Sequence, residues 1–282
     1  MNDLALLDAC LLGIIQGVTE FLPVSSDGHL VIAQGYLHGF NQRAMTFDVM
    51  LHFGTLLAVV LYFWRDVRSL LYFLIGKELQ GNPFPVKSWF WLIIIATIPT
   101  GIIGLTLEKT VEPLFSSPTF AAGAIFLNGI VLLLTVIAPK GERQAGDLRV
   151  RDAILIGITQ GLAVLPGISR SSNTIATAMF LGFRGDIAAQ FSFLISIPAV
   201  AGAVLVKSRE LHGASLAELI PYAVGAAVAL ITGLWAIGFL LKVIMKGKFR
   251  YFGYYCLIRG KPRLLRRGTF KVGLWGRGLK VW

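Results

Sequence analysis

The 282-residue chain is 55% hydrophobic and only 15% charged, and its mean hydropathy is +0.72. Soluble domains usually carry about 25% charged residues, so this composition excludes an ordinary soluble protein and indicates an integral membrane protein built of helices. Only two cysteines occur, both in apolar surroundings, which excludes a disulfide framework. The net charge of +11 fits the Lys and Arg excess of cytoplasmic loops, so we expect no nucleic-acid partner.

Apolar segments of two lengths follow along the chain. Five are long enough to span a bilayer, and they lie near 46–64, 88–107, 118–138, 187–206 and 218–241. Four shorter ones lie near 4–22, 28–37, 152–165 and 172–183. The short segments form two pairs, each around a Pro-containing polar turn, and runs of this length are more typical of re-entrant or buried helices than of spanning ones.

The two halves of the chain resemble each other. GIIQGVTEFLPVSS (13–26) aligns with GITQGLAVLPGIS (157–169), and FDVMLHFGTLLA (47–58) aligns with FSFLISIPAVAG (191–202) at an offset of 144. We therefore predict one integral membrane domain over 1–282, with repeats of about 1–140 and 150–258. Each half would hold one re-entrant helical hairpin and three transmembrane helices, which is an inverted-topology repeat. The last helix, near 249–265, is doubtful.

The distribution of Lys and Arg predicts the orientation of this all-α polytopic fold. With the N-terminus outside, the cytoplasmic loops are expected at 65–87, 139–151 and 242–250. Together with Arg184 they hold thirteen Lys and Arg residues, whereas the outer loops hold four, as the positive-inside rule requires. The first hairpin would then enter from the outside and the second from the cytoplasm. Transporters of this architecture have their binding sites near the membrane midplane, where two broken helices meet.

Gln16 and Glu20 stand four residues apart and share a face of the predicted first helix. A carboxylate within the membrane indicates a functional site, although a glutamate at the interface could simply assist a helix end. Glu20 could hold Mg²⁺ or Ca²⁺, with the Gln16 carbonyl as a second ligand. It could equally serve as a general base.

Polar residues follow Pro23 at the turn of the first hairpin. Ser25 and Ser26 could cap the next helix, or the same helix N-terminus could bind an anion. His29 stands where it could be a nucleophile or a general acid or base, although a lone histidine is more often a packed structural residue.

The second hairpin turn carries the sequence LPGISRSSNTIATAMF (165–180). Arg170 lies among hydroxyl side chains between two apolar arms, where it is costly unless paired. A phosphate would pair with it bidentately, whereas Glu20 or the cytoplasmic interface could also neutralise it. Gly167 allows a tight turn or a close backbone approach. Together the two turns predict an anion site, for phosphate, within reach of lipid.

These motifs resemble those of the undecaprenyl-diphosphate phosphatase family, also called bacitracin-resistance proteins. Its first signature runs here from Gln16 to His29, and its second, Pro-Gly-x-Ser-Arg-Ser-x-x-Thr, from Pro166 to Thr174. The resemblance covers roughly 1–255. It implies a bacterial plasma-membrane enzyme that hydrolyses undecaprenyl diphosphate to the monophosphate and phosphate, recycling the lipid carrier for peptidoglycan synthesis. Bacitracin binds undecaprenyl diphosphate, so an enzyme that removes this diphosphate is expected to confer resistance to bacitracin.

The resemblance also implies roles for single residues. Glu20 and Gln16 would belong to the metal and catalytic site, with Mg²⁺ or Ca²⁺ as the cation, and Ser26 or His29 would be the nucleophile. Arg170 would bind phosphate. The second loop would be supported by Ser169, Ser171 and Thr174. We group these three residues with Ser25, Gly167 and Arg170 as the predicted substrate-binding residues. We expect the polyprenyl lipid and bilayer lipids as partners and allow for a homodimer, with the site open to the extracytoplasmic side.

Two features depart from the family pattern. Asp27 stands where a small neutral residue is expected, and it adds negative charge beside the phosphates. The tail 259–282 carries eight basic residues, a proline and several glycines in place of a final apolar helix. Such a tail cannot span a membrane, and it is expected to lie on anionic lipid.

Two other functions fit parts of the pattern. A transporter of phosphate or of the polyprenyl lipid would also use inverted repeats, broken helices and an anion site. It would not need a nucleophile and base beside that site. A lipid-diphosphate binder without activity would protect against bacitracin without releasing phosphate.

Overall fold

The computed structural model describes residues 3–34, 37, 44–77, 85–115, 118–207 and 216–260. Within these ranges every regular element is helical. The α-helices are α1 (Asp3–Phe21), α2 (Ser26–Gln34), α3 (Ala44–Tyr62), α4 (Trp64–Leu74), α5 (Val86–Phe115), α6 (Pro118–Leu134), α7 (Val150–Leu162), α8 (Arg170–Phe180), α9 (Gly185–Lys207), α10 (Leu216–Met245) and α11 (Tyr251–Arg259), and two 3₁₀ turns are η1 (Thr135–Ile137) and η2 (Ala145–Asp147).

Four helices of the described ranges are long and apolar enough to cross a membrane. They lie in Val86–Leu107, Thr119–Ile137, Gly185–Val206 and Leu219–Met245. Phe47–Tyr62 and Trp64–Leu74, with a bend of 86° between them, are long and apolar enough only as a pair, and the pair makes a fifth span if it is counted as one. All five predicted spans are therefore helices, and the chain is a multi-pass membrane protein of the all-α class.

Helix α4 differs from the sequence expectation, which placed a cytoplasmic loop at 65–87. The charged residues Arg65, Asp66 and Arg68 suggested a loop, but they occupy one side of a short amphipathic helix. Its opposite side carries the exposed side chains Leu71 and Leu74. A helix with one polar and one apolar side suits the plane of a membrane interface.

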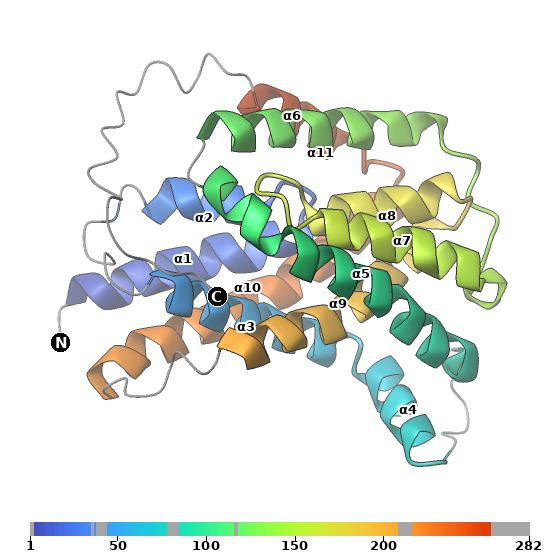
Figure 1. Ribbon diagram of the computed structural model, residues 1–282, viewed down its shortest axis with the longest axis horizontal. Coiled ribbons are helices and arrows are strands. Elements are labelled where there is room, and N and C mark those ends of the chain that lie inside the picture. The colour runs from blue at the N-terminus through green and yellow to red at the C-terminus, as the bar shows by residue number, and fades with distance from the viewer. Residues whose placement is uncertain are drawn as a thin grey trace.

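The four short segments form two helical hairpins, α1–α2 and α7–α8, as predicted (Figure 1). The turn at 22–25 joins the first pair and the turn at 163–169 joins the second, and Figure 1 shows both turns near the middle of the molecule. Helix α1 packs along α10, α5 packs along α7, and α6 packs along α11. The inverted relation of the two halves stays a prediction. Of the predicted basic tail, only Arg259 and Gly260 lie within the described residues.

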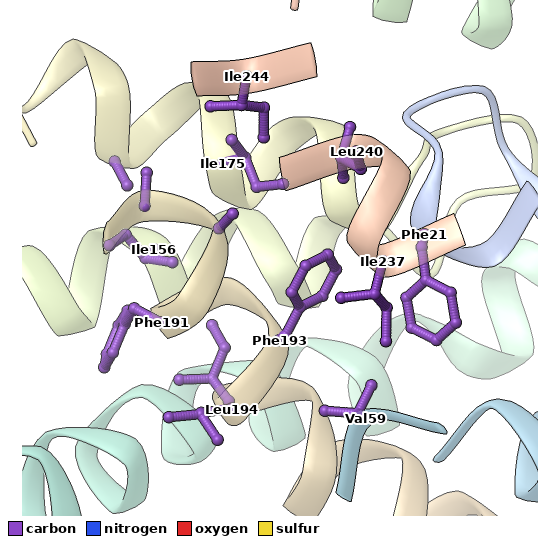
Figure 2. Packing of buried hydrophobic residues seen from close by; sticks show 14 of the residues in the cluster. Phe21, Val59, Ile156, Ile175, Phe191, Phe193, Leu194, Ile237, Leu240 and Ile244 are labelled. Carbon is purple, nitrogen blue, oxygen red and sulfur yellow. The ribbon is translucent and has the colours of Figure 1, made fainter. Parts of the chain in front are cut away.

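Helix α9 forms the centre of the main hydrophobic cluster. Phe191, Phe193 and Leu194 of this helix are fully or almost fully buried, and Figure 2 shows them among side chains from several other helices. The ring of Phe193 meets Phe21 edge to face at 5.6 Å, and Phe191 meets Trp89 at 5.1 Å. Since lipid tails are as apolar as these side chains, close packing stabilises the bundle more than exclusion of water does. Phe21 ends α1, so this packing also fixes the first hairpin turn.

One arginine ties the second hairpin to the loop that precedes it. Arg143 donates to both carboxylate oxygens of Asp152, at 3.1 and 2.5 Å, and to the carbonyls of Leu181 and Asp147. Its guanidinium also lies 4.0 Å from the centre of the Phe183 ring. Because Asp152 begins α7 and Leu181 ends α8, one side chain holds both ends of the hairpin.

Replacing Arg143 with lysine is expected to lower the free energy of unfolding by about 2 kcal/mol, because an ammonium keeps the charge but loses the bidentate contact and the ring stacking. Thermal unfolding in detergent measures this. Arg184→Lys is the matched control: Arg184 also contacts a carboxylate through two nitrogens, but its partner Asp186 is partly exposed. That change should cost less than about 1 kcal/mol. Equal shifts in the two variants would contradict the role of Arg143.

Candidate functional site

Both hairpin turns contain a residue in the left-handed backbone region. Ser25 has φ = 71°, and it is the one non-glycine residue of the described ranges with a positive φ. Gly167 has φ = 92°, and a Cβ atom there would lie 2.5 Å from the carbonyl oxygen of Ala121. Strained conformations of this kind cluster at functional sites. Each turn ends directly at or near a helix N-terminus, that of α2 at Ser26 and that of α8 at Arg170.

Glu20 joins the two turns. Its Oε2 accepts a hydrogen bond from Ser26 Oγ at 2.7 Å and from Gln16 Nε2 at 3.1 Å. Its Oε1 forms an ion pair with the guanidinium of Arg170, which lies 150 residues later in the chain. The Glu20 side chain is buried, whereas that of Arg170 is 22% exposed. The structure thus brings together four residues that the sequence placed in two separate motifs.

The hydroxyl residues of the second turn hold its backbone in place. Ser169 is the N-cap of α8, where its Oγ accepts from the Ser172 N–H at 3.3 Å and lies 3.2 Å from Ser171 Oγ. Thr174 is completely buried and bonds the hydroxyl of Ser192 in α9. These contacts support the loop that carries Arg170. Thr174 has no exposed surface, and its role in substrate binding stays a prediction.

Both ring nitrogens of His29 contact groups other than Ser26 and Glu20. Its Nδ1 lies 2.7 Å from the carbonyl oxygen of Ser25, which can only accept, so Nδ1 carries the proton. Its Nε2 therefore accepts from the hydroxyl of Tyr255 in α11, at 2.6 Å, and the two rings are stacked. In this arrangement Ser26 has Glu20 as its neighbouring base. Tyr255 contacts a predicted site residue, and no pattern in the sequence indicates this contact.

His52 and Asp27 complete the charged surroundings of Glu20. His52 Nε2 lies 3.7 Å from Glu20 Oε2 and 4.0 Å from Asp27 Oδ1, while its Nδ1 bonds the carbonyl of Asp48 at 2.8 Å. Asp48 and His52 stand four residues apart in α3, and the structure directs His52 to the site. Arg170, together with His52 when it is protonated, can thus offset the two carboxylates.

The residues around Glu20 fit a divalent cation that takes most of its ligands from water and substrate. Gln16 Oε1 is buried and has no hydrogen-bond partner within the described part of the chain. The Nε2 atom of the same Gln16 side chain bonds Glu20, so the Gln16 amide lies next to the Glu20 carboxylate. No group of three or more His, Cys, Asp or Glu residues in the described ranges could hold a metal by itself. Mg²⁺ is commonly bound through only one or two carboxylates together with substrate phosphates.

The arrangement combines a nucleophile, a base and an anion-binding group. The short Ser26–Glu20 hydrogen bond is the geometry of an activated hydroxyl. Arg170 and the N-terminus of α8 offer positive charge and N–H groups to an anion. Such a set can transfer an acyl or phosphoryl group to Ser26 and then to water.

Comparisons with known proteins agree with these motifs. The family model described as "Bacitracin resistance protein BacA" matches residues 9–261. A protein of Halothermothrix orenii named undecaprenyl-diphosphatase is 40% identical over 262 residues, which covers 92% of this chain and 97% of the relative. Proteins of the same name from Syntrophotalea carbinolica and Methanobrevibacter smithii are 41% and 38% identical, covering 91% and 90% of this chain and 97% and 95% of the relatives. The chain therefore belongs to the BacA family of bacitracin resistance proteins.

Proposed function

We propose that this protein hydrolyses undecaprenyl diphosphate to undecaprenyl phosphate and inorganic phosphate. The observation that carries this proposal is the position of Glu20, with Ser26 Oγ at 2.7 Å from one carboxylate oxygen and Arg170 on the other. Nucleophile, base and phosphate-binding group thus meet at one residue. The name shared by the relatives supports the same reaction.

The reaction proceeds in two displacements. Ser26 Oγ attacks the terminal phosphorus, Glu20 takes the hydroxyl proton, and the bond from that phosphorus to the bridging oxygen breaks, which releases undecaprenyl phosphate. Glu20 passes this proton to the leaving phosphate or to solvent and is again a carboxylate. A water molecule then gives a proton to Glu20 and attacks the phosphorus of the phosphoserine. The Oγ–P bond breaks, Ser26 Oγ takes the proton from Glu20, and inorganic phosphate leaves. Arg170 binds the phosphate oxygens through both steps and offsets the charge that develops on them.

A divalent cation, Mg²⁺ or Ca²⁺, belongs to this proposal. Gln16 and Glu20 would hold it, and its chemistry would be to neutralise charge on the diphosphate. The unpartnered Gln16 oxygen supports this assignment. Phosphate release that continues in the presence of EDTA would contradict the role of a divalent cation.

The setting of the reaction follows from the membrane fold. We place the protein in the plasma membrane, with its site open to the extracytoplasmic side, because the Lys and Arg bias favours an outside N-terminus. The prenyl chain stays among bilayer lipids while the diphosphate enters between the hairpins. The reaction recycles the lipid carrier of peptidoglycan synthesis and removes the target of bacitracin. A homodimer stays a prediction.

Phosphate release by the purified protein from a C55 polyprenyl diphosphate tests the function, with Mg²⁺, Ca²⁺ or EDTA present. Arg170→Lys is expected to lower turnover by roughly 100-fold, because lysine cannot reproduce the bidentate contact to phosphate. Arg184→Lys, at an exposed pair, should be as active as the wild type. Uptake of phosphate or polyprenyl phosphate into vesicles without any hydrolysis would favour the transporter alternative.

A further inference from the structure

One buried amide in α6 contacts the turn of the first hairpin and the first turn of α8 in the second. Asn128 Nδ2 donates to the carbonyl oxygen of Pro23 at 3.1 Å, and it also lies 3.7 Å from the Cys256 thiol. Its Oδ1 accepts from Asn173 Nδ2 at 3.0 Å and from the hydroxyl of Ser172. Only 2% of Asn128 is exposed. The side chain is therefore saturated on both ends by groups of two different hairpins.

The two anchor points lie close to the reacting groups along the chain. Pro23 precedes Ser26 by three residues, in the turn that the strained Ser25 backbone ends. Ser172 follows Arg170 by two residues, in the first turn of α8. An amide has a fixed length, and its donor and acceptor ends cannot be exchanged without breaking both contacts.

We propose that Asn128 is a positioning residue that sets the separation between Ser26 and Arg170. The inference rests on the proposed function, because it concerns the distance between the nucleophile and the group that binds the phosphate. Misplacement of reacting groups by about 1 Å can lower a rate by roughly 100-fold. Asn128 touches neither substrate nor the reacting atoms, and it acts through the two hairpin turns.

The surrounding contacts predict that the fold tolerates loss of this amide. The Ser172 hydroxyl also bonds the carbonyl of Ser169 at 3.0 Å, and the Pro23 carbonyl also accepts from the Cys256 thiol at 3.5 Å. Asn128→Leu would therefore leave these partners with a second contact. A buried polar group that keeps one hydrogen-bond partner destabilises the fold less than a group that is left without any partner.

The test is the steady-state kinetics of Asn128→Leu in the full-length protein with the C55 diphosphate. We expect kcat to fall by roughly 30- to 100-fold. KM should change less than about threefold, since Arg170 still binds the lipid diphosphate before reaction. The thermal midpoint in detergent should stay within about 4 °C of the wild-type value. A residue with a purely structural role would not lower kcat so strongly while leaving the thermal midpoint almost unchanged.

A double-mutant cycle adds a second readout. Ser172→Ala removes one anchor of the amide, and its effect on kcat should disappear when Asn128→Leu is already present. Ser196→Ala is the matched control, because Ser196 is also buried, and among the described residues its hydroxyl donates to a carbonyl of its own helix, that of Phe193, at 2.7 Å. It should leave kcat unchanged and should add independently to the Asn128 variant.

Each outcome decides between the two proposals. Normal kcat in a folded Asn128→Leu protein, or additive effects with Ser172→Ala, would overturn the positioning role and leave the phosphatase intact. Absence of phosphate release by the wild-type protein would refute the proposed function, and with it the role of Asn128.

Discussion

Glu20→Gln is expected to lower kcat for phosphate release by about 10³- to 10⁴-fold. A glutamine amide keeps the size of the side chain, and its oxygen can still accept from Arg170. It cannot take a proton from Ser26 Oγ, which now lies 2.7 Å from a carboxylate oxygen. The measurement is turnover of the C55 diphosphate at saturating substrate, with size-exclusion chromatography to establish that the variant is folded.

Asp27→Asn is the matched control for this change. Asp27 also belongs to the first hairpin, and its carboxylate lies 4.0 Å from His52 Nε2. Within the described part of the chain no hydrogen bond joins it to Ser26. Removal of its charge should change kcat by less than about tenfold, consistent with a screened charge rather than a proton acceptor. A Glu20→Gln protein with more than a tenth of normal turnover would exclude Glu20 as the base.

Gly157→Ala is expected to cause the largest loss of stability among the substitutions considered. A Cβ atom at Gly157 in α7 would lie 2.2 Å from the carbonyl oxygen of Ala96 in α5, and Thr100 of α5 donates to the Gly157 carbonyl at 2.9 Å. The helices would have to separate, at a cost of about 3 kcal/mol. We expect the thermal midpoint in detergent to fall by roughly 6–10 °C.

Gly101→Ala provides the comparison within the same helix pair. A Cβ atom at Gly101 would meet nothing within 4 Å, so the substitution adds a methyl group without a clash. Replacing glycine within a helix by alanine also favours the helix by up to about 1 kcal/mol. The midpoint should stay the same or rise. An equal fall for Gly101→Ala and Gly157→Ala would show that the close approach of α5 and α7 is unimportant.

The helices could largely be predicted from the sequence, because hydropathy and segment length carry the signal in a membrane protein. The paired short segments around Pro23 and Pro166 became the two hairpins, and all five long segments became helices. Helix α4 was missed because charges within four residues of Trp64 resembled a loop. The apolar residues Val67, Leu70, Leu71 and Leu74 recur at helical spacing, and that pattern could have identified it.

The site could be predicted only in part, since its contacts join distant parts of the chain. Ser26 and Glu20 are six residues apart across one turn, so their meeting was within reach of a local argument. The bond from His29 to Tyr255 spans 226 residues, and no local pattern indicates it. The bridging role of Asn128 is equally invisible, because sequence shows a polar residue in an apolar helix but not which groups it contacts.

The pairing of Glu20 with Arg170 also has a consequence for biosynthesis. The two residues are 150 positions apart, and ribosomes add about 5–20 residues per second, so the arginine follows the glutamate by roughly 8–30 s. During that interval the nascent chain holds the Glu20 carboxylate with His52 as its nearest basic neighbour. A chain arrested in its first half would lack the guanidinium that pairs with this carboxylate in the complete fold.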